Sequence, residues 1–246
     1  MIKFFRKIRQ RLLSENKFSR YLIYAIGEIV LVVIGILIAL QINTWNKNKQ
    51  LRLSELETLS EIQVALNQDV SVLSTNLKNL ETKILHSREV IMHIENKLPY
   101  DKKLDGLFMD VYYHRGYKTF NNSGFELLKE RGFDIIQNTD LRKRITKHYT
   151  TDLSDINGIL TRIEQLGLIQ ADNLYDNFKL TKNPEGSGGI MTAYDYNQLI
   201  NDPKVLGPFY HLELLNLTYE RNLMGFKEKT EEVLKMVDTE LAERKK

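Results

Sequence analysis

The sequence predicts an all-α protein: a single N-terminal transmembrane helix followed by an elongated helical bundle with a long, coiled-coil-like first helix. Three observations predict this fold. Residues 21–42 form a nearly uninterrupted apolar run, residues 44–98 carry apolar side chains at heptad spacing, and two further amphipathic stretches follow. With only 4 prolines and 13 glycines in 246 residues, a turn-rich β-sandwich is disfavoured.

The apolar run, YLIYAIGEIVLVVIGILIALQI, is long enough to cross a bilayer. As a helix it would span about 33 Å at about 1.5 Å per residue, and Glu28 is its only charged residue. Tyr21, Tyr24 and Trp45 lie where aromatic side chains are expected at the membrane surfaces. The run exceeds the apolar part of a cleaved signal peptide, so we expect residues 21–43 to be an uncleaved signal anchor.

The charges that flank the run predict its orientation. Residues 1–20 contain seven basic residues and one acid, whereas only Lys47, Lys49 and Arg52 follow the run closely. By the positive-inside rule, residues 1–20 lie in the cytoplasm and residues 44–246 lie outside. We therefore expect a single-pass protein of the cell inner membrane, with a periplasmic C-terminal region in a Gram-negative bacterium.

The arm at residues 1–20 is amphipathic as well as basic. In a helix its apolar side chains fall on one face and its basic side chains on the other, which is typical of a helix lying on an anionic membrane surface. The expected contacts with the anionic cytoplasmic leaflet are Lys3, Arg6, Lys7, Arg9 and Arg11. Nucleic acid is the less favoured partner for this arm because the chain is tethered to the membrane, so we expect no nucleic-acid binding.

The chain opens with this basic arm, then SENK, then YAIGEIVLVVIGILIALQIN and a tryptophan. This combination, over residues 1–46, resembles the opening of an uncharacterised bacterial family of single-span membrane proteins, domain of unknown function 6090. The remainder is similar in general organisation, a mostly helical region with an FELLKERGFDII segment. Since the family has no established activity, the resemblance implies localisation and architecture but no mechanism.

A heptad pattern follows the apolar run, and Pro99 ends it. Eleven of its thirteen a and d positions are apolar. The a positions are Leu56, Gln63, Val70, Leu77, Ile84, Ile91 and Leu98, and the d positions are Leu59, Leu66, Leu73, Leu80, Ser87 and Ile94. Either a second copy of the chain covers this stripe in a parallel coiled coil, or downstream helices cover it in a bundle.

Downstream patterns favour the bundle. Amphipathic helices are predicted at roughly 139–178 and 207–244, with Pro208 in the first turn of the latter. Ser123 and Glu126 fit a capping box that starts a shorter helix, and Gly132 fits its C-terminal cap. We interpret residues 99–122 as a bent connection and residues 182–189 as a loop, followed by a short helix near 194–200.

The sequence contains no recognisable catalytic or metal-binding motif. There is no cysteine, no two of the five histidines are four residues apart, and the GSGG segment lacks the Lys-Ser/Thr of a phosphate-binding loop. Abundant acids alternate with Lys and Arg, as on a solvated helix face. We therefore expect no enzyme activity, no cofactor and no metal site.

Three residues of the apolar run are candidates for pairing with another membrane helix. Glu28 is a carboxylate inside the span, and Gly35 with Ala39 gives the small-xxx-small spacing that lets helices approach closely. Glu28 could instead lie near the headgroups as a snorkelling or protonated side chain. A proton relay is the least favoured role, because one helix provides no pathway.

These features favour a membrane-anchored helical interaction or scaffold protein, with a protein partner or a homo-oligomer as its assembly. The alternative is an extracytoplasmic ligand-sensing helical bundle without its own output domain. An enzyme whose site is assembled across helices is the least favoured class.

Overall fold

The structure, a computed structural model, describes residues 18–112, 120–184, 186 and 188–244. The chain divides into two compact units, residues 1–54 and 55–246. Helix α2 (Phe18–Glu95) begins in the first unit and ends in the second. In the first unit, the described residues form this helix, and its large apolar side chains between Leu22 and Ile42 are exposed.

The second unit is a bundle of three long helices: α2, α6 (Leu153–Tyr175) and α8 (Leu206–Arg244). Side chains of α2 and α8 meet in antiparallel order, from Glu55 with Arg244, through Gln63 with Asp238, to Arg88 with Glu213. Helix α6 packs along α8. The three predicted long helices are confirmed, and the heptad stripe of α2 is covered by the same chain.

The buried seam of α2 contains all of the predicted d positions but a different second set. Its members alternate at spacings of four and three residues. They are Glu55, Leu59, Ile62, Leu66, Asp69, Leu73, Asn76, Leu80, Lys83, Ser87, Val90 and Ile94. Of the seven predicted a positions, Ile84 and Ile91 are buried, four are half-buried and flank this seam, and Leu98 lies beyond the end of the helix. The second set of seam residues is Glu55, Ile62, Asp69, Asn76, Lys83 and Val90. Because four of these six residues are polar or charged, a search for regularly spaced apolar residues does not find this set.

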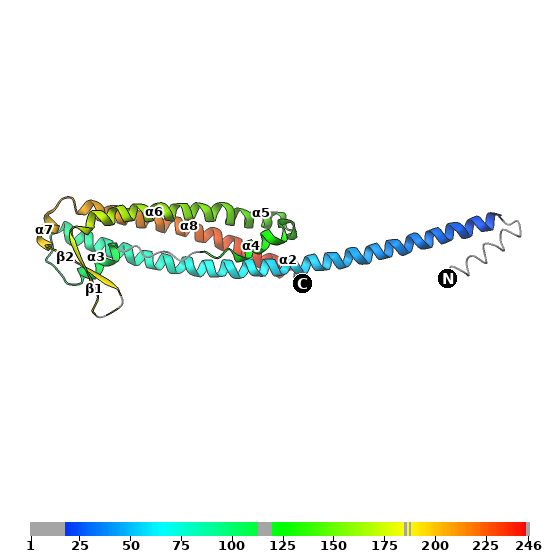
Figure 1. The fold of residues 1–246 in the computed structure, drawn as a ribbon, viewed down its shortest axis with the longest axis horizontal. Helices are drawn as coiled ribbons and strands as arrows, with labels where there is room; N and C mark the ends of the chain where they lie inside the picture. The colour runs from blue at the N-terminus through cyan, green and yellow to red at the C-terminus, as the bar shows by residue number, and fades with distance from the viewer. Residues whose placement is uncertain (1–17, 113–119, 185, 187, 245–246) are drawn as a thin grey trace. The chain divides into compact units, whose positions relative to one another are not determined.

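Three apolar clusters follow one another along the bundle. The first joins α2 to α4 (Ser123–Arg131), η1 (Phe133–Ile135), α5 (Thr139–Lys147) and the end of α8. The middle cluster joins α2, α6 and α8. The third joins the end of α2 to α3 (Leu104–Tyr112), a β-hairpin, α7 (Tyr196–Asn201) and the start of α8. Figure 1 shows α3, α7 and the hairpin at one end of this unit and α4 and α5 at the other.

Helix α4 lies unusually close to α2. A Cβ atom on Gly124 would be 2.7 Å from Ile62 Cα, so glycine is required for this approach.

The prediction of a capping box at the start of α4 was wrong in detail: Asn122 is the N-cap, and the Ser123 amide donates to Asn121 Oδ1. Gly132 caps the C-terminus at a φ of +90°, as expected.

The segment after α6 contains a β-hairpin that the sequence did not predict. Strands β1 (Phe178–Lys182) and β2 (Gly189–Ala193) are antiparallel, with Lys182 paired to Gly189 beside the predicted loop. Helix α6 ends at Tyr175, three residues before its predicted end, and β2 packs against α3. Helix α3 also lies within the stretch predicted as a bent connection, whereas α7 confirms the expected short helix.

Candidate functional site

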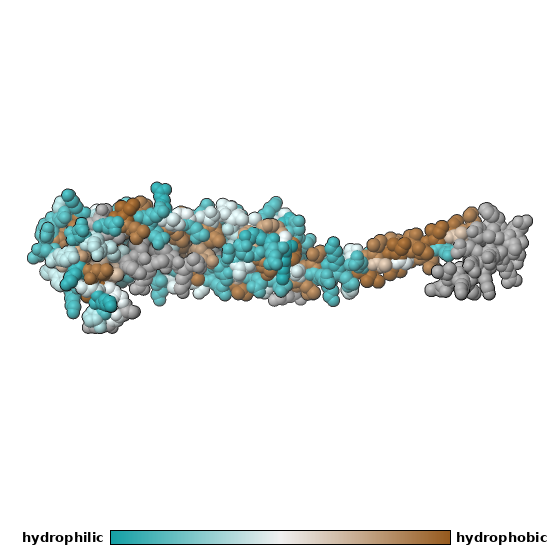
Figure 2. Space-filling view, viewed as in Figure 1, coloured by the Kyte–Doolittle hydropathy of each residue, from teal (hydrophilic) through white to brown (hydrophobic). Residues whose placement is uncertain are grey.

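The first candidate site is the apolar part of α2. Within the described residues, this is the one helix long and apolar enough to cross a membrane, and none of its apolar window is buried by the protein. Figure 2 shows this segment as a mostly apolar surface. Trp45 lies just beyond it, exposed, with the Lys49 ammonium 5.7 Å from its ring centroid. Such a helix is consistent with a membrane anchor.

Glu28, Gly35 and Ala39 lie on α2 at spacings that place them on one face of the helix. Glu28 is half-buried, and no atom lies within 4 Å of a Cβ added to Gly35. Pairing through this face stays a prediction. The predicted lipid contacts lie outside the described residues, as do the side chains of Tyr21 and Tyr24. These contacts are Lys3, Arg6, Lys7, Arg9 and Arg11.

A second candidate site surrounds a π-helical turn, η2 (His148–Asp152), between α5 and α6. Such turns insert one residue into a helix and are frequent at functional sites. Here the turn buries three polar side chains, those of His148, Tyr149 and Asp152, on the side that faces the bundle. The sequence predicted an uninterrupted helix over this region, because Tyr149 and Ile156 are spaced as in an ordinary helix.

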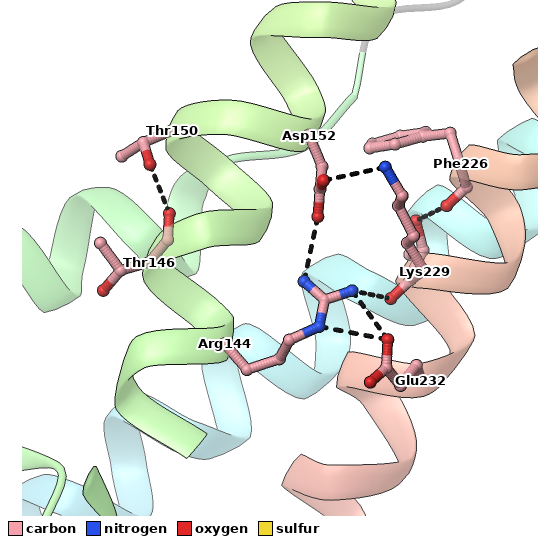
Figure 3. Close-up of polar contacts among 8 residues, drawn as sticks. Arg144, Thr146, Thr150, Asp152, Phe226, Lys229 and Glu232 are labelled. Carbon is pink, nitrogen blue, oxygen red and sulfur yellow. Dashed lines mark hydrogen bonds and ion pairs between the residues drawn. The ribbon is translucent and has the colours of Figure 1, made fainter. Parts of the chain in front are cut away.

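Asp152 is the centre of a charged cluster that joins the π turn to α8 (Figure 3). Its two carboxylate oxygens accept hydrogen bonds from Arg144 Nη1 and Lys229 Nζ, each at 3.0 Å. Arg144 also donates to Glu232 and to the Lys229 carbonyl oxygen. Burial opposes ionisation of Asp152, but the hydrogen bonds and charges of Lys229 and Arg144 outweigh it and lower its pKa.

His148 is buried beside this cluster and is held in its neutral form. Burial, followed by the positive charge of Arg144, lowers its pKa to about 4. Its ring stacks on Phe226 with centroids 5.2 Å apart, and its Nδ1 atom has no hydrogen-bond partner. Because His148 is closed to solvent, its ring nitrogens are not available to a substrate in this conformation.

Asp69, on the seam of α2, is a third buried group with a displaced pKa. Its Oδ1 atom accepts a hydrogen bond of 2.7 Å from the Asn121 amide. Burial raises its pKa to about 6, and the Asn121 hydrogen bond opposes this shift only in part. Burial and then the charge of Asp69 raise the pKa of Tyr149, whose hydroxyl has no hydrogen-bond partner.

The ion pairs of Asp152 fix the π turn against α8, and the side chains of His148, Tyr149 and Asp152 are closed to solvent. Among the described residues, no group of three or more His, Cys, Asp or Glu side chains could hold a metal ion. His86 forms a 2.8 Å pair with Asp110, which links α2 to α3.

The comparison with protein families adds one result. A profile of a family of unknown function, DUF6090, matches residues 28–159, more than half of the chain. The chain belongs to DUF6090. The match to DUF6090 extends from the apolar run through α4, α5 and the π turn into α6, and thus includes Arg144 and Asp152 but not Lys229 or Glu232 on α8. No curated protein and no solved structure matches the chain.

Proposed function

We propose that this DUF6090 chain is a membrane-anchored interaction protein, whose helical unit holds a protein partner or a second copy near the membrane. The observation that carries the proposal is the contrast between the two units. The apolar side chains of α2 from Leu22 to Ile42 are exposed, whereas the second unit buries its own apolar seam with α6 and α8. Lipid is the environment that would cover such an apolar helix, and the bundle is then free to bind a partner.

The basic arm supports a signal anchor with its N-terminus in the cytoplasm and the bundle in the periplasm of a bacterium. Reporter fusions test this topology. A periplasm-active reporter joined after Lys246 should be active, and the same reporter joined before Met1 should be inactive. The reverse pattern would overturn the proposed orientation and the inner-membrane location of the bundle.

The exposed apolar side chains of the bundle support the interaction role. Leu168 and Ile169 are more than half exposed on α6, and Leu214 is 62% exposed on α8, the helix against which α6 packs. Figure 2 shows an apolar patch over the part of α6 that leads to the hairpin. Exposed apolar patches on a folded domain often mark protein contact sites.

Site-specific photo-crosslinking in cells tests the interaction role. A photoreactive residue at Leu168 should give one predominant adduct, identified by mass spectrometry as a partner protein or a second copy of this chain. The same residue at Arg162, a charged and exposed position of α6, is the matched control and should give none. Equal or absent crosslinking at both positions would contradict an interaction surface at this patch.

A ligand-sensing bundle is the second candidate, and the buried groups with displaced pKa values support it. Asp69 and Tyr149 would respond to a ligand that changes the packing around the π turn. Such a ligand should raise the melting temperature of the full chain in detergent. A screen of small molecules that produces no shift would leave the interaction role as the favoured one. We propose no catalytic role for either unit.

A further inference from the structure

The outward face of α5 and the π turn forms a shallow hollow of about 350 Å³, widely open to solvent, that the interaction role does not use. This volume lies at the lower end of the range for small-ligand sites. The hollow lies on the side of α5 opposite the buried Leu141 and Ile145. Its lining residues are Phe133, Arg142, Lys143, Thr146, Lys147 and Thr150.

Three cationic side chains are the hydrogen-bond donors available to this hollow. Lys143 and Lys147 form no ion pair with any other described residue. Arg142 forms a 3.5 Å pair with the fully exposed Asp134, and its Nη1 atom donates to the Ile136 carbonyl oxygen at 3.0 Å, so its Nε and Nη2 atoms are the donors that could reach a ligand. The hydroxyl groups of the two threonines are not available as donors. Thr146 and Thr150 donate to the carbonyl oxygens of Arg142 and Thr146, each at 2.8 Å.

The spacing of these cations favours an anion between them. Lys143 and Lys147 are four residues apart on α5, so their like charges are neighbours and destabilise the helix. An anion with several oxygen atoms can accept hydrogen bonds from both ammonium groups and from the guanidinium at once, which removes this repulsion. Phe133, 37% exposed, supplies an aromatic surface at the same hollow.

We propose that this hollow is a binding site for an organic phosphate, in which the phosphate contacts Arg142, Lys143 and Lys147. The apolar or aromatic part of the ligand packs against Phe133. A phosphate ester carries more charge and more acceptor oxygens than a carboxylate, which suits three cations on one helix face. The ester is either a soluble compound or a phospholipid headgroup.

Lysine footprinting of the full chain in lipid nanodiscs tests the site and distinguishes the two sources. In zwitterionic nanodiscs, phenyl phosphate is the soluble probe, with sodium chloride at equal ionic strength as the blank. In a parallel sample, the nanodiscs contain phosphatidylglycerol and no soluble phosphate. Acylation rates of Lys143 and Lys147 are compared by mass spectrometry with those of Lys78 and Lys235, which lie on α2 and α8.

We expect acylation of Lys143 and Lys147 to slow by about five-fold or more at a saturating probe, and that of Lys78 and Lys235 to be unchanged. Protection by phenyl phosphate assigns a soluble ligand, and protection only by phosphatidylglycerol assigns a headgroup. Lys143→Gln, a change at an exposed side chain, should reduce protection of Lys147, whereas Lys78→Gln should not. Absence of protection in both samples, or equal protection of all four lysines, would overturn the site.

Discussion

Asp69 is a single residue whose burial opposes the stability of the bundle at neutral pH. Its pKa is about 6 in the folded protein and 3.8 when unperturbed, so the folded state binds the extra proton between these values. The free energy of unfolding therefore falls as the pH rises through this window, and above pH 6 the ionised carboxylate costs about 1–3 kcal/mol.

Asp69→Asn should remove this cost. The amide oxygen can still accept the hydrogen bond from Asn121, but the buried charge is absent. We expect the variant to be about 1–3 kcal/mol more stable than the wild type at pH 7.5 and nearly equal to it at pH 4. Urea denaturation of the full chain in mild detergent, followed by circular dichroism, measures both values. A variant that is less stable than the wild type at pH 7.5 would contradict this account.

His148 acts in the opposite direction over a similar pH range. Its folded pKa of about 4 lies below the unperturbed 6.5, so the unfolded state binds the extra proton. Stability from the neutral ring is present above pH 6.5 and is lost as the pH falls to 4, by about 2–3 kcal/mol. In the wild type, this loss offsets the gain from protonation of Asp69.

His148→Phe should expose the contribution of Asp69. Phenylalanine can retain the stacking on Phe226 but cannot bind a proton. We expect the variant to be about 1–3 kcal/mol more stable at pH 5 than at pH 7.5, whereas the wild type should change little. The same denaturation experiment at the two pH values is the measurement. Equal pH dependence in both proteins would show that His148 does not titrate as proposed.

At the scale of the elements, the sequence predicted helices well because most of their apolar residues recur at helical spacing. The d positions of α2 are all buried, as expected. The other half of its seam could not be predicted, because Glu55 and Asp69 are buried only by virtue of partners distant in sequence. Glu55 pairs with Arg244 on α8, and Asp69 binds the Asn121 amide. Nothing in a local pattern indicates such partners.

The hairpin and the π turn were missed for different reasons. Strand β1 is short and only Phe178 in it is buried, so its apolar pattern is weak. The π turn adds one residue to a helix, but the buried apolar residues on either side of it, Leu141, Ile145, Tyr149 and Ile156, are spaced by four or seven residues, as in an ordinary helix. The candidate site at Asp152 was missed because Lys229, on α8, meets it only after α8 packs beside the turn, and because Arg144 meets it across the unpredicted π turn.

The approach of α4 to α2 gives a test at the scale of elements. In Gly124→Ala, the new methyl group would meet the backbone of Ile62 at 2.7 Å, which α2 cannot relieve by rotating a side chain. We expect α4 to move away and the unit to lose about 1–3 kcal/mol of stability.

The matched control is Gly106→Ala, in α3, where nothing lies within 4 Å of the added atom. This variant should be at least as stable as the wild type, with a gain of up to about 1 kcal/mol, because alanine favours the helical conformation more than glycine does. Chemical denaturation of both variants measures the difference. Similar stabilities for the two would mean that α4 is not held closely on α2.

At the scale of the whole chain, α2 has two different surroundings along its length. Its first part exposes apolar side chains, and its second part is covered by α6 and α8 of the same chain. A parallel coiled coil of two chains would instead bring the a positions of the two copies together, so that Gln63 of one copy would face Gln63 of the other. The two arrangements therefore make opposite predictions for a cysteine at this position.

The absence of native cysteine allows a direct test of these arrangements. Gln63 Nε2 and Asp238 Oδ1 are 2.6 Å apart, so the pair Gln63→Cys and Asp238→Cys should be joined within one chain by a short bis-maleimide. The product should migrate as a monomer and, after digestion, should yield one linked peptide from α2 and α8. Gln63→Cys alone should give no dimer through the seam of α2, because α8 of the same chain contacts this position through Asp238. A crosslinked dimer from the single variant would instead place the seam of α2 between chains, and the partner-binding surfaces of the bundle would then have to be sought on a dimer.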